Sequence, residues 1–150
     1  MAKYNIWFSQ DEHPILSNLH PRIFQYKGLH FLNVEHAYQS IKSGKLNQYV
    51  YNHSNWQINR MYKSRDIPHT KNDWNIKLMG RLIHHSLLQN PDIIPYLINP
   101  AHPFVGKDKE VEFTHISKFK SEDVWTTQFP RILTIIRNHF ISLNKEKNNG

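Results

Sequence analysis

The chain has 150 residues and a formal net charge of +7 with neutral histidines, and it contains no cysteine. This length suits one ordinary domain, and the lack of cysteine excludes disulfides, thiolate metal sites and cysteine nucleophiles. The positive charge favours anionic partners such as phosphates, nucleotides or nucleic acid. A base-composition bias in the encoding genome explains the abundant lysine and asparagine equally well.

The sequence contains no signal for a membrane or a metal. It has no apolar run of 18 residues, and its first four residues lack the order of a signal peptide. The 11 histidines show no ligand spacing, and adjacent His84 and His85 would point about 100° apart on a helix. We therefore expect a cytoplasmic protein with no membrane partner, no metal and no other cofactor.

Short strands and then a helix are predicted in the first third of the chain. Residues 6–8 and the two arms around Lys27 and Gly28 read as strands, with Lys-Gly as the turn. Asn33 is placed to cap a helix, and Gly44 is placed near the end of that helix.

This helix carries two neighbouring stripes. Glu35, Gln39 and Lys42 fall at i, i+4 and i+7, beside an apolar stripe of Val34, Ala37, Tyr38 and Ile41. The helix would bury its apolar side and aim a carboxylate, an amide and an amine at one place. Glu35 lies in the first turn, where the helix dipole favours its ionised form and suits it to stabilise a cation or to act as a nucleophile. The alternative is a solvated face of ordinary polar residues.

The remaining elements are mostly helical. Residues 45–64 predict one or two short helices, and Asp73 is placed to cap a long helix over 74–89. Pro91 follows as the start of another helix, and residues 111–116 read as a strand. Pro130 predicts the start of the final helix. The buried stripes expected on the two long helices are Ile76, Met79, Ile83 and Leu87, then Phe129, Ile132, Leu133, Ile136 and Phe140.

Two groups of residues near the start of the chain share order and spacing with the motifs of one family. The first is Leu16-Ser17-Asn18-Leu19, and the second runs without a gap from Gly28 through Phe31 and Val34-Glu35-His36-Ala37-Tyr38-Gln39 to Lys42. Weaker matches follow at Arg65, Asp73-Trp74, residues 78–81 and 89–91, Asp123-Val124-Trp125 and Arg137. Over roughly residues 6–140 the chain resembles the NADAR/YbiA-like N-glycosidase family.

The predicted elements add up to a helix-rich α+β fold in a single domain over residues 1–143, with a flexible polar tail over 144–150, and the resemblance implies that this domain is YbiA-like. It also implies cleavage of a ribosyl-base or ADP-ribosyl-base bond. We expect removal of ADP-ribose from modified nucleobases in preference to hydrolysis of riboflavin-pathway intermediates. The alternative is a non-catalytic domain that binds ADP-ribose, another nucleotide or nucleic acid.

The chemistry of the reaction selects candidate catalytic residues. Cleavage of an N-glycosidic bond develops a sugar cation at C1′, so the site needs an anion beside that carbon. Glu35 is the candidate anion, and Lys42 is a candidate Schiff-base nucleophile with a solvent-facing charge as its alternative. Asp123 matches the family's acid before its tryptophan, where it would bind ribose hydroxyls or orient a water; otherwise it is an acid at a helix start.

Five further residues are candidates for substrate binding. Trp74 and Trp125 are suited to stack on a base, although large aromatics also serve as core residues. Arg65 is a phosphate candidate because of its bidentate geometry. Asn18 and Gln39 would contribute amides, although an asparagine after serine is ordinarily a turn residue.

The chain departs from the family pattern on one wall of the expected site. Thr126 and Thr127 replace the usual glycine and asparagine, and no Gly-rich loop separates Trp125 from Pro130; Leu32 replaces a proline. Such loops usually hold phosphate, so an open wall should favour a bulky polymer-borne substrate over a small one. The lysines and arginines are spread along the chain, which predicts few phosphate contacts.

Overall fold

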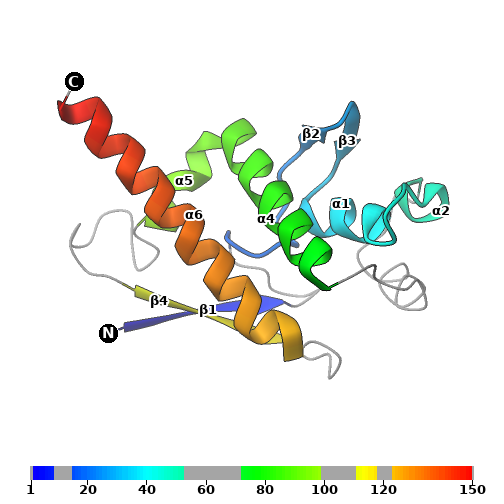
Figure 1. Cartoon of the computed structure of the whole chain (residues 1–150), viewed down its shortest axis with the longest axis horizontal. Helices are drawn as coiled ribbons and strands as arrows, with labels where there is room; N and C mark the ends of the chain where they lie inside the picture. Colours follow the sequence, from blue (N-terminus) through cyan, green and yellow to red (C-terminus); the bar gives the residue numbers. More distant parts are fainter. Residues whose placement is uncertain (1, 9–14, 53–71, 99–110, 118–122, 150) are drawn as a thin grey trace. The chain divides into compact units, whose positions relative to one another are not determined.

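The computed structural model describes residues 2–8, 15–52, 72–98, 111–117 and 123–149 (Figure 1). Its elements form the expected helix-rich α+β fold, with two small two-stranded sheets. Contacts group the chain into a central unit, Asn18–Asn90, and a terminal unit, Met1–Ser17 with Pro91–Gly150. A single domain over 1–143 stays a prediction, and each unit is described separately. Within the described ranges, no helix is both long and apolar enough to cross a bilayer.

The central unit contains the predicted hairpin. Strand β2 (Phe24–Tyr26) pairs antiparallel with β3 (Leu29–Phe31), so that Phe24 lies opposite Phe31. Lys27 and Gly28 both have positive φ angles, 51° and 80°, as a two-residue type I′ hairpin turn requires. A Cβ on Gly28 would meet nothing within 4 Å, so the backbone angle and not the space favours glycine there.

Helix α1 (Val34–Ile41) begins where the sequence predicts. The Asn33 side chain accepts a hydrogen bond of 2.8 Å from the His36 N–H, which satisfies one unpaired donor of the first turn. Gly44 has a φ of 98° just beyond the helix end. A short helix α2 (Gln48–Tyr51), capped by Asn47, follows. The rest of the helical region expected over 45–64 lies outside the described residues.

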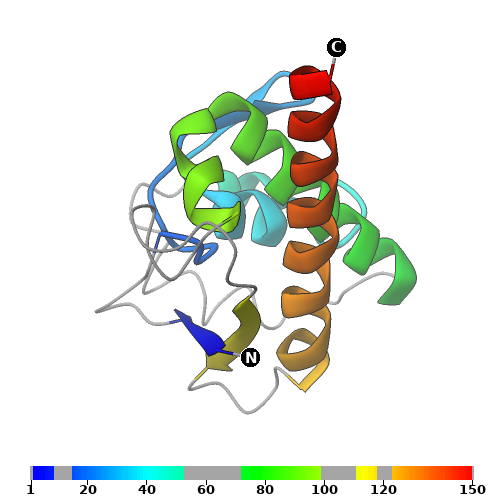
Figure 2. The same cartoon turned by 90° about the vertical axis from the view of Figure 1, so that its left-hand side faces the viewer.

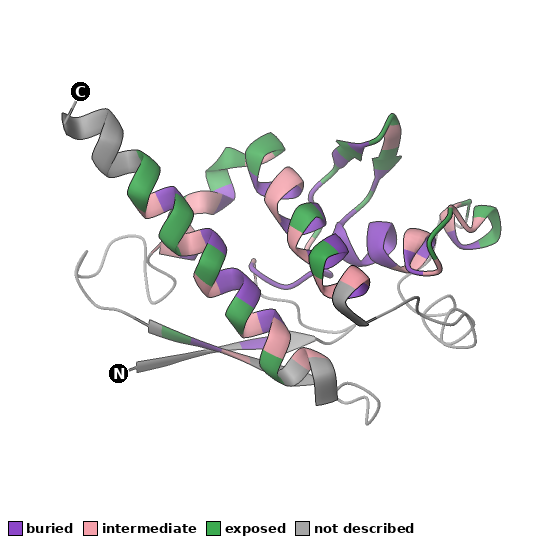
Figure 3. Ribbon diagram, in the orientation of Figure 1, coloured by how far each residue is buried: buried purple, intermediate pink, exposed green. Residues whose placement is uncertain are grey.

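Helix α4 (Asn72–Gln89) packs against both α1 and β2 of the central unit. It begins earlier than expected, so Asp73 is not the N-cap but lies in the first turn. Met79, Ile83 and Leu87 of the expected stripe are buried, as are Leu78 and Leu82, while Ile76 is half-buried. The alternation of buried and exposed residues along α4 is visible in Figure 3.

The hairpin is tied to the end of α4 by a side-chain amide. The Gln25 N–H donates to Gln89 Oε1 (2.7 Å), and Gln89 Nε2 donates to the Gln25 carbonyl (2.8 Å). Asn90 Nδ2 donates to the Ile23 carbonyl (3.0 Å). These bonds satisfy backbone groups on the outer edge of β2, which would otherwise be open to pairing with another strand.

The terminal unit pairs the two ends of the chain. Strand β1 (Ala2–Phe8) runs parallel to β4 (Val111–Ser117), in register from Ala2 opposite Val111 to Phe8 opposite Ser117. Helix α6 (Asp123–Asn149) lies against β4 in both views (Figures 1 and 2). The Arg137 guanidinium lies 4.7 Å from the centre of the Phe113 ring. The 3₁₀ turn η2 (Pro91–Ile93) and helix α5 (Ile94–Ile98) complete this unit, with Pro91 as the expected first residue.

Helix α6 is longer than predicted at both ends. Pro130 lies inside it and does not begin it, because the turn from Asp123 is already helical. A proline there removes one helical N–H donor, and the Thr134 hydroxyl donates to the Pro130 carbonyl (2.9 Å). Residues 144–149 continue the helix where a flexible tail is expected, because Lys and Glu are good helix formers and the first breaker is Gly150. All five residues of the expected stripe, Phe129, Ile132, Leu133, Ile136 and Phe140, are buried.

Candidate functional site

The start of α1 is held by the loop that carries Asn18. The Glu35 N–H donates to the Asn18 carbonyl (3.1 Å), and Asn33 Nδ2 donates to the Leu19 carbonyl (3.2 Å). The loop therefore supplies acceptors for the first turn, while the Asn33 side chain caps it from the other side. This arrangement fixes the backbone of Glu35 and brings Asn18 beside it.

Glu35 is buried and hydrogen-bonded to its neighbour on the helix. Its side chain is 5% exposed, and Gln39 Nε2 donates to Glu35 Oε1 at 2.6 Å. Because an ionised carboxylate only accepts hydrogen bonds, the Gln39 amide must turn its nitrogen toward Glu35 and its oxygen away. A solvated polar face is therefore wrong for Glu35, whose carboxylate lies at a helix N-terminus within the protein.

Two amide oxygens in this region lack a hydrogen-bond partner among the described residues: Asn18 Oδ1 and Gln39 Oε1. The Asn18 nitrogen is used, since Nδ2 lies 3.3 Å from Met79 Sδ and thereby connects the loop to α4. Buried acceptors without donors are costly and rare in folded proteins. These two oxygens are available to hydroxyl or N–H donors of a ligand.

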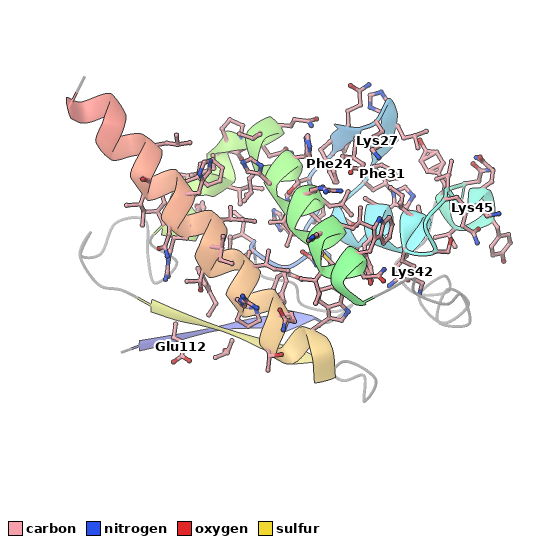
Figure 4. All side chains as sticks on the ribbon, in the orientation of Figure 1. Phe24, Lys27, Phe31, Lys42, Lys45 and Glu112 are labelled. Carbon is pink, nitrogen blue, oxygen red and sulfur yellow. The ribbon has the colours of Figure 1, made fainter. Side chains whose placement is uncertain are left out.

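Lys42 is the C-cap of α1 and is also buried, with 2% of its surface exposed (Figure 4). Its N–H donates to the Tyr38 carbonyl (2.8 Å), and its carbonyl accepts from Asn75 Nδ2 (3.1 Å) on α4. A solvent-facing charge is therefore wrong for Lys42 as well. The backbone of Lys42 is fixed from both sides, by its own helix and by α4.

We call Asn18, Glu35, Gln39, Lys42 and Asn75 the α1 site. The first four are predicted from the sequence, and the structure places them within one unit, around α1. Asn75 is missed by the sequence reasoning, because an asparagine beside Trp74 in the first turns of a helix gives no local signal of burial. Only the packing of α4 on α1 shows that this amide, 3% exposed, holds the backbone of Lys42.

His36 orients α1 and takes no place in the predicted chemistry. Its Nδ1 accepts from the Leu32 N–H (3.1 Å), so its Nε2 carries the proton and donates to the Tyr51 carbonyl (3.1 Å). The ring stacks on Tyr51 with 5.5 Å between centroids and meets Phe31 edge-on. A neutral imidazole thus connects Leu32, which precedes the N-cap Asn33, to the end of α2.

Arg22 is a second buried group that the sequence reasoning misses. Its guanidinium is fully buried, its Nε donates to Ser86 Oγ (3.1 Å), and burial lowers its pKa to about 10. It remains charged at neutral pH. An arginine next to a short strand gives no local signal of burial, which follows only from the packing against α4.

The other predicted site residues are less closely defined. Trp74 is half-buried at the start of α4, next to Asn75, and Trp125 is half-buried in α6. Asp123 is the first residue of α6, but its side chain and the whole of Arg65 lie outside the described part of the structure. Asp123 and Trp125 belong to the terminal unit. Their predicted roles, like those of the α1 site, stay predictions.

The structure has a helix at the place where the family pattern has a Gly-rich loop. Residues 125–130 are continuous helix within α6, so no loop intervenes between Trp125 and Pro130. Among the side chains that the structure describes, no three potential ligands gather to hold a metal ion.

Comparison with known proteins supports the fold and nothing finer. No family model and no curated protein matches the sequence. The structure is similar to the NMR structure of the E. coli protein YbiA, with a TM-score of 0.69 and 16% sequence identity over 97% of this chain and 90% of that one. The chain therefore has a YbiA-like fold.

Proposed function

We propose that the chain is an N-glycosidase that hydrolyses a ribosyl-base or ADP-ribosyl-base bond, with the α1 site as its catalytic centre. The observation that carries the proposal is the buried Glu35 carboxylate, held at 2.6 Å by Gln39, beside the unpartnered amide oxygens of Asn18 and Gln39. The YbiA-like fold and the motif resemblance support the same reaction class.

The charges of the reaction match this arrangement. When the bond between C1′ and the base breaks, its electron pair leaves with the base and positive charge develops on the sugar. A carboxylate fixed at a helix N-terminus is preorganised to stabilise that charge. Water then adds its oxygen to C1′, one of its protons goes to the departing base nitrogen, and a free sugar and a free base result.

The unpartnered oxygens suggest how the sugar is held. Ribose hydroxyls are donors, and Asn18 Oδ1 and Gln39 Oε1 are acceptors that lack donors among the described residues. Binding of a ribosyl group would satisfy both oxygens and would position C1′ beside Glu35. We therefore assign the two amides to substrate binding.

Lys42 defines a variant of the mechanism. Desolvated lysine amines attack sugar carbonyls to form Schiff bases in other enzymes, and Lys42 is buried two helical turns beyond Glu35. In this variant the amine bonds to C1′ as the bond from C1′ to the base breaks, and the base leaves with the electron pair and a proton from the amine. The sugar ring then opens to give a C=N bond, and water hydrolyses that bond to restore the amine and release the sugar. Borohydride added during turnover would trap the adduct on Lys42.

The test is turnover of two substrates at the same salt concentration: an ADP-ribosylated oligonucleotide and a free riboflavin-pathway intermediate. We expect release of ADP-ribose, with a higher kcat/KM for the oligonucleotide. An unlabelled Lys42, together with an active Lys42→Met variant, would assign direct attack to water. Failure of every ribosyl-base substrate to react would overturn the proposal.

A non-catalytic binding domain is the second candidate function. The continuous helix over residues 125–130 favours it, because a Gly-rich phosphate-binding loop has no place there. ADP-ribose binding measured by calorimetry, with no release of base from any substrate, would favour this candidate.

A further inference from the structure

The net charge of the chain is concentrated in one of its two units. The central unit, residues 18–90, contains ten lysines and arginines against three carboxylates, which leaves +7. The terminal unit contains nine of each and is neutral overall. The expectation that the basic residues are spread along the chain is therefore incomplete. The cations are divided almost equally between the two units, but most of the carboxylates lie in the terminal unit.

The described surface of the central unit is positive only. Its exposed charged side chains are all cations: Lys27, Lys45, Lys77 and Arg81. Glu35, the acid of this unit whose side chain the structure describes, is buried. Over residues 18–52 and 74–90, no exposed carboxylate opposes these cations.

Two of the cations share a stripe of α4 with two histidines. At 100° per residue, Lys77, Arg81, His84 and His85 fall within about 100° of one another. At the same spacing, the buried residues Leu82, Ile83 and Ser86 fall mainly on the other side of the helix. The stripe from Lys77 to His85 rises by about 12 Å.

The hairpin extends this stripe with an aromatic ring and another cation. The Tyr26 ring meets His85 edge-on at 5.2 Å between centroids, and Lys27 Nζ lies 5.6 Å from the centre of the Tyr26 ring. The paired bonds between Gln25 and Gln89 hold the hairpin on α4. The cations of the two elements therefore belong to one preformed surface.

We propose that this surface, which we call the α4 basic face (Lys27, Lys77, Arg81, His84 and His85), binds the phosphodiester backbone of a nucleic acid strand. A stripe of about 12 Å is long enough to contact at least two successive phosphates of a strand, because phosphates follow one another about every 3.4 Å along the axis of a duplex strand and about twice as far apart in an extended single strand. The partly exposed imidazole rings of His84 and His85, between the cations, offer stacking surfaces for bases. This binding deepens the proposed function. It rests on that function only as the explanation of why the protein would hold a nucleic acid polymer.

The test reverses two charges of the face and, as a control, two exposed charges that are not part of it. The variant Lys77→Glu with Arg81→Glu is compared with Lys45→Glu with Arg131→Glu, which changes one exposed lysine and one exposed arginine and has the same net charge. Binding of a labelled single-stranded DNA is followed by fluorescence anisotropy across a range of KCl concentrations. All proteins carry Glu35→Gln so that no substrate is consumed, and circular dichroism verifies that each is folded.

We expect the face variant to lose at least about tenfold in affinity and its salt slope to become shallower by about 1.4, which is the effect of two lost contacts at about 0.7 each on a single strand. The control should stay within about twofold of the parent. Equal losses in both variants would show that net charge alone acts, and would overturn the proposal. So would absence of DNA binding by the parent, or binding of phosphatidylserine vesicles in place of DNA.

The same variants, rebuilt with Glu35 intact, separate this inference from the proposed function. Turnover of a free ADP-ribosylated nucleoside by the face variant should equal that of the parent, while kcat/KM for the modified oligonucleotide falls. DNA binding through the face without turnover of any substrate would leave the inference standing and overturn the enzyme. Turnover of both substrates at parental rates by the face variant would leave the enzyme standing and overturn the inference.

Discussion

The two units differ most in what they bury. Among the described side chains, every buried charged group lies in the central unit: Arg22, Glu35 and Lys42. The buried residues of the terminal unit are apolar except for Ser17. Burying a charge is unfavourable unless partners or a function compensate for it. The contrast therefore places the candidate chemistry in the central unit and assigns mainly apolar packing to the terminal unit.

The first prediction tests whether both units depend on apolar packing to the same degree. Leu82→Ala in the central unit and Leu133→Ala in the terminal unit each empty a buried site, at 0% and 2% exposure. We expect each to lower the free energy of unfolding by about 2–5 kcal/mol. Leu88→Ala, at an exposed position of the same helix as Leu82, should change it by less than about 0.5 kcal/mol. Urea denaturation measures all three, and a small effect of Leu133→Ala alone would show that the terminal core is loosely packed.

The second prediction compares the same chemical change in the two units. Glu35→Gln keeps the shape of a buried carboxylate but removes its charge, so turnover should fall about 10²–10³-fold. Glu112→Gln makes the same change at an exposed position of β4 (Figure 4) and should leave turnover unaltered. Activity of Glu35→Gln within a few-fold of the parent would remove Glu35 from the mechanism.

The third prediction separates binding from stability at Asn18. Asn18→Leu removes an unpartnered buried oxygen, whose burial typically costs about 1–3 kcal/mol, and leaves the backbone carbonyl that accepts from Glu35. We expect thermal stability to be unchanged or higher, while KM for the ribosyl substrate rises. Kinetics and thermal denaturation on one preparation would reveal the trade-off. A lower melting temperature with an unchanged KM would make Asn18 a purely structural residue.

The fourth prediction concerns the pH dependence that Arg22 contributes. Burial lowers its pKa in the folded chain to about 10, below the ordinary value of a guanidinium. Between these values the unfolded chain holds a proton that the folded chain has released, so the free energy of unfolding rises with pH. Relative to Arg22→Met, the parent should be unchanged from pH 6 to 9 and should gain roughly 1 kcal/mol by pH 11. A constant difference over the whole range would show that Arg22 stays charged throughout.

Local signals account for the elements that the sequence predicts correctly. The hairpin follows from Lys27-Gly28, which adopts the left-handed turn, and α1 follows from the Asn33 cap. The buried faces of α4 and α6 follow from helical periodicity, because an amphipathic helix must bury its apolar stripe. Errors fall at helix ends, where Pro130 is tolerated inside α6 and residues 144–149 stay helical.

The sequence by itself determined the secondary structure around Glu35 and put Glu35, Gln39 and Lys42 on one stripe, because these features depend on neighbours within a few residues. Only the tertiary structure decided that Glu35 and Lys42 are buried, and that Asn75 and Arg22 join them in the interior. It also decided that the cations at Lys77 and Arg81 face solvent, unopposed by any exposed carboxylate among the described residues of the central unit. Whether a residue is buried, and which residues share a surface, depends on how elements distant in sequence pack together. Local sequence patterns do not predict that packing.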